Sequence, residues 1–570
     1  MTNGVRSNAF LANMAATYTF NSKFNLMLRS GIDFSSEIRK QQRPYSSANY
    51  LRGFYKEQNI QDYEINTDFL LSYKDKIGSD INVTASVGGN AMSTKYSRVD
   101  ASVIGLVIPG VYMLSNGVGT PEVVNVDRNK KVNSLYGTAS LAYKNKWFVD
   151  VTGRNDWSST LPIQNNSFFY PSINTSVILS DILRLPASIS FAKLRLSAAQ
   201  VGNDTDPYKT SKYYGTSPFP GSGSVPTLLH NVNFKPEIST NYEAGLDIRL
   251  FKSRLNLDLT YYSNTTRNQI LEVPMDPTTG YSRAVLNAGA VRNRGIEVVL
   301  TGSIIKKKNF SWTSILTWAK NQNRVLELAE GMEGKQDIGY GGNATIQARV
   351  GGTTGDIYGF GFLRSPDGQI VYNAATGLPA RPQEIQYIGS AYADWKGGIR
   401  NEFTYKNYRF SFLIDGQLGG MIYSQSHHKM MEQGKLKSSL PGREENYIVG
   451  VGVVQNPDKS YSPNTTKVLP VDYYGDYYRR ANVESNSFDA SYLKLREARL
   501  EYNFPKNLLG KSFFKQVSVA LYGRDLLMIS SFPVFDPETA ALNGATILPG
   551  VEMGQLPSSR TIGANITVKF

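Results

Sequence analysis

The chain has 570 residues, of which 41% are hydrophobic and 12% aromatic, and its 61 Lys and Arg against 47 Asp and Glu give a formal net charge of +14. The aromatic content excludes an intrinsically disordered chain, because aromatic side chains gain too much from burial and stacking. With no cysteine and only three histidines, the sequence excludes disulfide frameworks, cysteine-ligated zinc and thiol catalysis. We therefore expect no catalytic residues, no metal site and no cofactor.

Neither a membrane-spanning helix nor an export signal is recognisable. The best apolar run, residues 103–114, is shorter than the ~18–20 residues that a spanning helix needs. The first residues, MTNGVRSN, lack the charged start, apolar core and cleavage site of a secretory signal. The chain is therefore expected to be either cytoplasmic or the downstream part of a longer protein.

The positive charge forms one tight cluster, the three lysines at residues 306–308. This cluster lies at a turn between two alternating segments. A solvated turn explains it better than a nucleic-acid site does, so we expect no nucleic-acid partner.

Alternation of polar and apolar residues with a period of two dominates the chain and predicts β-strands. In chain order, the clearest segments are residues 242–250, 255–261, 296–300, 310–318, 403–405, 408–414, 517–521 and 562–570. Short polar turns at 252–254, 306–308 and 406–407 join neighbouring segments into β-hairpins. We count roughly eighteen such segments, many of them about ten residues long, and no convincing helix.

Two architectures contain this many strands: a series of soluble sandwiches or propeller blades, and one large transmembrane barrel. Crossing a bilayer takes about nine to eleven residues per strand, whereas sandwich strands average about five or six. Aromatic residues gather at strand ends (168–170, 261–262, 513–514), and short turns alternate with long polar connections (202–241, 331–394, 424–486). These features favour an all-β fold, a large antiparallel transmembrane β-barrel.

The last residue, Phe570, completes the alternation of the final strand. Outer-membrane barrels typically end in an aromatic residue, and the barrel-assembly machinery reads that last strand. We therefore predict that Phe570 is an outer-membrane assembly signal. The alternative is a hydrophobic terminus packed into a core.

Several segments, taken together, resemble one family. They are RNDWSST at 154–160 then FYPS at 169–172, KLRLS at 193–197 then GN at 202–203, KPE at 235–237 then YEAGLD at 242–247, and SYLKLR at 491–496 then YNFP at 502–505. Their order and spacing resemble those of the SusC/RagA-type TonB-dependent outer-membrane transporters of Bacteroidetes. In GRDLL at 523–527, Asp525 departs from the Asn that the family usually has.

This resemblance implies a barrel of about twenty-two strands, the size class whose lumen is plugged, in the outer membrane of a Gram-negative bacterium. Upstream of the barrel it implies a signal peptide, a small periplasmic domain, a TonB-contacting motif and a plug, none of which is recognisable in this sequence. Residues 1–570 are therefore expected to be the C-terminal portion of the barrel, with most of its strands and without the plug.

The function implied by the resemblance is nutrient import, of glycan oligomers or peptides, without bond chemistry. A SusD-like surface lipoprotein would cap the extracellular mouth, and the TonB complex would supply energy through the N-terminal region. Outer-membrane lipid and lipopolysaccharide would surround the barrel. The net charge of +14 is left open between contact with lipid A phosphates and contact with an acidic partner.

The strongest candidate for ligand contact is DYYGDYYRR at residues 472–480. Tyrosine rings stack on sugars or peptide side chains, and Asp and Arg add hydrogen bonds. The alternative is an aromatic girdle or loop packing. The residues that we predict to bind ligand are Trp157, Tyr473, Tyr474, Tyr477 and Tyr478.

Three other motifs resemble known binding sites but lack the residues or the geometry that such sites need. GGTTG at 351–355 lacks the lysine and the strand–helix context of a phosphate loop. Asp204 and Asp206 lack the downstream Gly and Glu of a calcium loop. His427 and His428 are expected on a strand, where adjacent side chains point to opposite faces and do not share one metal ion.

Two alternatives of other classes stay open: a surface-exposed β-sandwich protein that binds carbohydrate through tyrosine-rich loops, and a β-rich glycan-degrading enzyme that uses carboxylates. A membrane barrel partitions with outer membranes and migrates faster on an unheated gel. Both alternatives would stay in the aqueous fraction.

Overall fold

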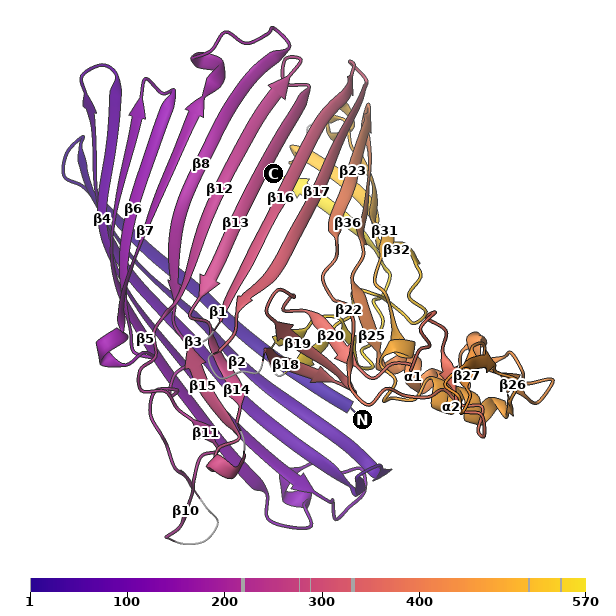
Figure 1. Ribbon diagram of the computed structural model, residues 1–570. Helices are drawn as coiled ribbons and strands as arrows, with labels where there is room; N and C mark the ends of the chain where they lie inside the picture. The colour runs from indigo at the N-terminus through magenta and orange to yellow at the C-terminus, as the bar shows by residue number, and fades with distance from the viewer. Residues whose placement is uncertain are drawn as a thin grey trace. The chain divides into compact units, whose positions relative to one another are not determined.

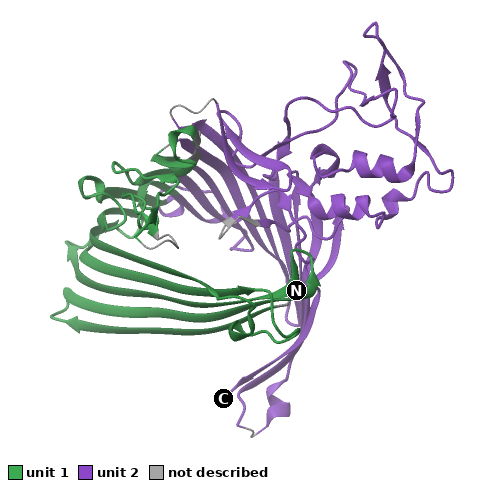
Figure 2. Cartoon of the chain, turned by 90° about the horizontal axis from the view of Figure 1, so that it is seen from below, with its two compact units in different colours: residues 1–177, 195–242, 266–288 green, residues 178–194, 243–265, 289–570 purple. Residues whose placement is uncertain are grey.

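The computed structural model of the chain describes residues 2–216, 221–275, 277–287, 289–329, 334–510, 513–543 and 546–570. Most of these residues are in β-strands, and 17 strands belong to one large antiparallel sheet (Figure 1). In this part of the chain, no helix is long and apolar enough to span a membrane. The chain divides into two compact units: unit 1 is residues 1–177, 195–242 and 266–288, and unit 2 is residues 178–194, 243–265 and 289–570 (Figure 2).

Unit 1 contains a run of long strands in which each strand pairs with the next in antiparallel orientation. Its strands are β1 (Thr2–Thr19), β2 (Phe24–Ser47), β3 (Tyr50–Ile77), β4 (Ile81–Ile104), β5 (Glu122–Tyr143), β6 (Trp147–Ser158) and β7 (Ser167–Ile178). A tight turn joins β5 to β6, where Lys144 and Asn145 adopt the left-handed conformation (φ 51° and 54°) that such hairpins require.

The strands of unit 1 separate a polar face from an apolar face, as strict alternation requires. The register of β2 and β3 sets Leu28 opposite Phe69 and Arg29 opposite Asp68. Leu28 and Phe69 are 53% and 40% exposed, whereas Asp68 is 7% exposed. Burial is thus inverted relative to a soluble protein, which is the pattern of a sheet whose outer face contacts lipid.

Unit 2 contains a second run of strands that pair with their neighbours in the same way. They are β16 (Ala290–Lys306), β17 (Phe310–Glu327), β23 (Trp395–Tyr405), β24 (Tyr408–Leu418), β31 (Tyr492–Asn503), β32 (Gln516–Ser530) and β36 (Thr561–Lys569). They confirm the strands predicted from residue 296 onward. Three further strands, which include the hairpin predicted at 242–261, have residues in both units: β8 (Ile189–Asn203), β12 (Glu237–Leu250) and β13 (Leu255–Arg267).

Burial in unit 2 is inverted as well. Phe410 of β24 is 41% exposed, and the next residue, Ser411, is 4% exposed. On β32, Leu521 is 62% exposed and Ala520 only 1%. The apolar residues of these strands therefore face away from the protein's own core.

The long connections of unit 2, predicted as polar loops, contain folded structure. Strands β18 (Lys335–Gly341), β19 (Ala344–Arg349), β20 (Asp356–Gly359) and β22 (Gln386–Ser390) form one small sheet, and β25 (Met421–Ser424), β30 (Ser487–Asp489) and β35 (Val551–Glu552) form another. Their buried side chains share a core that includes Ile346, Ile357 and Tyr423. Two short helices, α1 (Gln425–Glu432) and α2 (Pro470–Tyr477), complete this region, and a third, α3 (Lys506–Leu509), lies in the connection between β31 and β32.

The remaining strands are short. They are β9 (Gly215–Thr216), β10 (Gly223–Ser224), β11 (Leu228–Leu229), β14 (Ile270–Pro274), β15 (Arg283–Asn287), β21 (Val371–Tyr372), β26 (Ile448–Val449), β27 (Val453–Gln455), β28 (Tyr461–Pro463), β29 (Lys467–Val468), β33 (Ala541–Asn543) and β34 (Thr546–Leu548). They lie in the connections between the long strands.

Candidate ligand-binding site

Helix α2 carries the first three of the four predicted tyrosines, and Tyr478 follows as its C-cap. The helix begins at Pro470, whose fixed φ and missing N–H suit the first helical turn. Residues four apart lie on one side of a helix, so the rings stack in two pairs. The ring centroids of Tyr473 and Tyr477 are 5.4 Å apart, and those of Tyr474 and Tyr478 are 6.3 Å apart.

The Tyr473–Tyr477 pair packs into the folded part of the connections. The Tyr473 hydroxyl lies 3.4 Å from the hydroxyl of Tyr372, a residue that is 2% exposed. The Tyr477 ring centroid lies 4.7 Å from that of Phe362, which is 3% exposed. These two tyrosines therefore have much of their ring surface covered by the protein itself.

Arg381 packs against the same aromatic group. Its Nη2 donates to the Asp476 carboxylate (2.9 Å) and to the Asp476 carbonyl (2.7 Å), and its guanidinium lies 5.3 Å from the Phe362 ring centroid. Burial lowers the pKa of Arg381, an effect that Asp476 partly offsets. Burial raises the pKa of Tyr473, and it raises the pKa of Tyr477 to about 12. Both hydroxyls therefore stay protonated at neutral pH.

The Tyr474–Tyr478 pair faces helix α1. Ser424 caps α1, since its side chain accepts from the His427 backbone N–H (3.0 Å). His428 Nδ1 donates to the Tyr478 carbonyl (2.7 Å), and the His427 ring centroid lies 5.2 Å from that of Tyr478. The expectation that the two histidines lie on a strand is wrong. Both are on α1 and almost fully buried, and the described residues contain no group of three or more His, Asp or Glu that could hold a metal ion.

A hollow of about 410 Å³ opens beside Tyr474, between the end of α1 and the start of α2. Of the four predicted tyrosines, only Tyr474 lines it. Arg443 and Glu432 contribute opposite charges to its wall. Arg443 Nε donates to the Ser439 carbonyl (2.8 Å), and Glu432 accepts from Lys429 Nζ (2.7 Å). This arrangement suits a ligand with several hydrogen-bonding groups and an apolar or sugar face that stacks on the tyrosine ring.

Trp157 lies in unit 1, on the apolar face of β6. It is an even number of residues from Val149 and Val151 and therefore shares their face of the strand. Trp157 is 40% exposed, whereas its neighbour Asp156 is 7% exposed. The structure therefore groups the four tyrosines in unit 2 and places Trp157 where residues of an interfacial aromatic girdle occur.

Phe570 directly follows β36. Its ring centroid lies 5.2 Å from that of Phe513 and 5.7 Å from that of Phe514, and the residue is 63% exposed. The three rings form an exposed aromatic group at the end of the final strand. The role of Phe570 as an assembly signal stays a prediction.

A hollow of about 330 Å³ on the polar face of unit 1 is lined by none of the predicted ligand-binding residues. Arg154, Tyr136 and Tyr170 line it. Arg154 Nε donates to Asp156 Oδ1 (2.7 Å), the Tyr170 hydroxyl donates to Asp156 Oδ2 (2.5 Å), and the Arg154 guanidinium lies 5.7 Å from the Tyr136 ring centroid. The alternation of side chains along the strand could have indicated this hollow from the sequence. Arg154 and Trp157 are three residues apart, so they fall on opposite faces of one strand.

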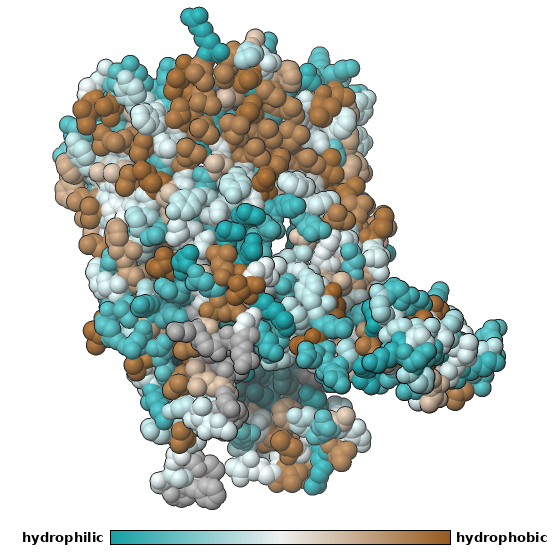
Figure 3. Space-filling model, in the orientation of Figure 1, coloured by the Kyte–Doolittle hydropathy of each residue, from teal (hydrophilic) through white to brown (hydrophobic). Residues whose placement is uncertain are grey.

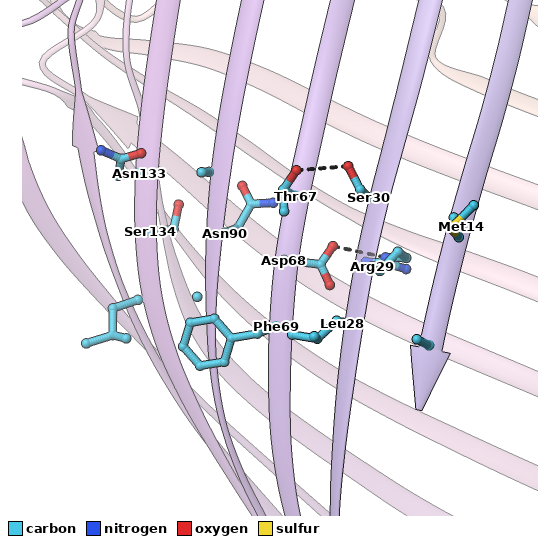
Figure 4. A pocket seen from close by; sticks show the side chains of 14 residues that line it. Met14, Leu28, Arg29, Ser30, Thr67, Asp68, Phe69, Asn90, Asn133 and Ser134 are labelled. Atoms are coloured by element: carbon cyan, nitrogen blue, oxygen red, sulfur yellow. Dashed lines mark hydrogen bonds and ion pairs between the residues drawn. The ribbon is translucent and has the colours of Figure 1, made fainter. Parts of the chain in front are cut away.

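The largest of the described hollows, of about 650 Å³, is on strands β1 to β5 (Figure 4). Leu28, Phe69 and Leu135 line it, together with the hydroxyls of Ser30 and Thr67, which lie 2.9 Å apart. These side chains belong to the apolar face. The hollow therefore opens toward the apolar surroundings of the sheet, away from the face that polar solutes would follow.

Comparison with known families gives a match over most of the chain. A family described as "TonB dependent receptor-like, beta-barrel" matches residues 2–526. The TonB-dependent receptor P26 of Formosa agariphila is 25% identical over 614 aligned residues, which cover 100% of this chain and 60% of that protein. The TonB-dependent receptor SusC of Bacteroides thetaiotaomicron is 23% identical over 466 residues, 77% of this chain and 43% of that protein. The chain thus spans roughly half the length of these relatives.

Solved structures of similar fold cover the whole chain. The RagAB peptide transporter superposes with a TM-score of 0.79 at 17% identity, over 100% of this chain and 62% of that chain. The RagAB peptide importer in its closed-closed state gives a TM-score of 0.78 at 18% identity. Such identities show a shared fold alone. Together with the matched family, they confirm the predicted β-barrel fold.

Proposed function

Because the chain belongs to the TonB-dependent receptor β-barrel family, in its SusC/RagA-type outer-membrane branch, we propose that it forms the wall of a nutrient importer of the outer membrane. The observation that carries this proposal is the inverted burial of the strands, such as exposed Phe410 next to buried Ser411. A sheet with an apolar outer face and a polar inner face suits a conduit that lies in lipid and passes hydrated solutes.

The proposed receptor is longer than this chain. This part of the proposal is supported by the length of the relatives, because the chain aligns with 60% of the P26 receptor and 43% of SusC. In this proposal, residues 1–570 are the C-terminal portion of the barrel, and a plug and a segment that contacts the TonB complex complete the receptor. The intact mass of the protein from its source cell tests this part.

The proposed nutrients are peptides or glycan oligomers, with a SusD-like surface lipoprotein as the partner at the extracellular mouth and without bond chemistry in the barrel. The similar structures of the RagAB peptide transporter and importer support the peptide class. The hollow beside Tyr474 is lined by the aromatic ring of this residue and by the charged side chains of Arg443 and Glu432. Of the predicted ligand-binding residues, Tyr474 is the one that we place in direct contact with ligand.

This function is tested with the receptor at its natural length. In a strain that lacks the native gene, it should restore growth on peptides or oligosaccharides as sole nutrient. Replacing Tyr474 with Leu should weaken binding of a labelled nutrient about three- to tenfold, because a stacked ring contributes about 0.5–1.5 kcal/mol beyond its area. The same loss is expected for Arg443→Gln. Binding to the purified receptor is the measurement.

The matched control is Tyr461→Leu, which removes a half-exposed tyrosine of β28 whose hydroxyl accepts from Gln455 (3.2 Å) away from the hollow. It should bind like the wild type. Unchanged affinity in both test variants, at normal surface levels, would remove the hollow from the proposal. Release of sugars or amino acids by the purified receptor would instead favour an enzyme.

A further inference from the structure

The hairpin formed by β16 and β17 carries four cations at one end of its apolar face. From the turn outward, the paired residues of this face are first Leu300 and Leu316, then Val298 and Trp318, then Ile296 and Lys320, then Arg294 and Gln322, and finally Arg292 and Arg324. Figure 3, in the orientation of Figure 1, shows hydrophobic residues over the upper part of these strands and hydrophilic residues below them. The apolar band thus ends at Trp318, and the next two residue pairs of this face already contain Lys320 and Arg294.

The cations of this cluster lack acidic partners among the residues that the structure describes. Within the described residues, Arg292, Lys320 and Arg324 have neither a hydrogen-bond nor an ion-pair partner for their side chains, and Arg294 Nε donates only to the neutral Gln322 amide oxygen (2.8 Å). Arg292 and Arg324 lie directly opposite each other. Cross-strand Cα atoms are about 4.5–5.5 Å apart, and like charges at such positions destabilise the sheet. A bound anion would remove that repulsion.

The arrangement of the connections places the cluster near one membrane surface. A three-residue turn, 307–309, joins β16 to β17, whereas residues 328–394 join β17 to β23. In outer-membrane barrels the short turns are periplasmic and the long loops are extracellular. The cluster is at the long-loop end, which corresponds to the outer leaflet, and this leaflet consists of lipopolysaccharide.

We propose that Arg292, Arg294, Lys320 and Arg324 form a binding site for the phosphate groups of lipid A. Guanidinium groups bind phosphate oxygens through two parallel hydrogen bonds, and lysine adds a point charge. From Lys320 to Arg324 the cluster extends about 13 Å along the strand, enough for one glycolipid headgroup beside Trp318. The site goes beyond the import function and depends only on the outer-membrane location.

The test uses the receptor at its natural length, purified in mild detergent. It is titrated with phosphorylated lipid A, dephosphorylated lipid A and phosphatidylglycerol, and native mass spectrometry measures the bound lipid. The test variant is R292Q/R294Q/K320Q/R324Q. The matched control, K306Q/K307Q/K308Q, removes three charges from the turn at the other end of the same hairpin.

The wild type and the turn variant should bind phosphorylated lipid A about 10- to 100-fold more tightly than the dephosphorylated form, given four cations near a lipid surface. The test variant should lose this preference, and R292K/R294K/R324K should keep it because the charges remain. If the test variant fails to assemble, Lys320→Gln alone should weaken binding about fivefold.

Three results would overturn the site: an unchanged preference in the test variant, equal binding of the two lipid A forms by the wild type, or phosphatidylglycerol bound as tightly as lipid A. An unaltered affinity in Lys320→Gln, when only that variant assembles, would do the same. Nutrient uptake is not measured in this test. Its outcome therefore separates the lipid site from the import function.

Discussion

Lys494 of β31 is a charged residue with almost no access to solvent, since its side chain is 3% exposed. Its Nζ donates to both carboxylate oxygens of Asp536 (2.8 Å each), and Asp536 is itself 5% exposed. Glu538 also accepts from Lys494. These contacts fasten the segment after β32 to the polar face of the strands.

Replacing Lys494 with Met should leave the Asp536 carboxylate buried without its cation. Breaking a buried pair in this way costs about 3–5 kcal/mol, so the temperature at which the barrel loses its compact, fast-migrating form should fall clearly. The control is Lys429→Met, which breaks the exposed pair with Glu432 (2.7 Å) and should change stability by less than about 1 kcal/mol. Equal shifts in the two variants would contradict a structural role for Lys494.

At the scale of an element, helix α1 depends on two buried histidines that are neutral in the fold. Burial lowers the pKa of His427 and of His428 below their ordinary value of 6.5, and the Asn486 and Tyr478 hydrogen bonds oppose this shift only in part. Glu432 faces His428 Nε2 at 3.8 Å. A group whose pKa is lowered on folding binds its proton more readily when α1 opens.

The stability that these histidines contribute is therefore complete above pH 6.5 and declines as the pH falls below it. Lys429 and Arg480 add to the cost of protonating His428, whereas Glu432 reduces it. Hydrogen exchange of residues 425–486, corrected for intrinsic rates, should become faster between about pH 6.5 and 5. In the His427→Asn/His428→Asn variant this pH dependence should disappear. A wild type with the same protection at both pH values would contradict the prediction.

The strands could be predicted from the sequence because alternation is a local signal, visible at residues 408–414 or 562–570 without any knowledge of partners. Helices α1 and α2 could not, because eight residues make only about two helical turns, which is too short for a recognisable periodic pattern. Their formation depends on distant residues, such as Glu552, which accepts from the Ser424 hydroxyl (2.6 Å) across 128 positions. The tyrosine spacing predicted a cluster, but which ring lines a hollow depends on packing that no spacing reveals.

At the scale of the whole molecule, the apolar faces of both units suit lipid, so assembly in the membrane is a condition for the fold. Replacing Phe570 with Ala should lower the amount of receptor in the outer membrane several-fold, if the last strand is read as an assembly signal. The thermal stability of the receptor that does assemble should stay close to wild type, because Phe570 is 63% exposed. Surface level and heat-modifiable mobility are the measurements.

The matched control for Phe570 is Phe514→Ala, which removes a ring of the same aromatic group, 5.7 Å from Phe570. It should leave the surface level unchanged. If both variants assemble poorly, the aromatic group has a structural role and Phe570 is not read separately.

The pairing of each long strand with its neighbour in the chain, from β1 to β7 and from β23 to β24 and β31, has a consequence for evolution. A hairpin in such a wall can be duplicated or lost as one uninterrupted stretch of gene, because the backbone pairing of its strands extends only to the strands on either side. The strands that flank it can then pair with each other. Barrels of different circumference can therefore arise without a change in the order in which the other strands pair. The long connections can diverge in sequence independently of the strands that they join.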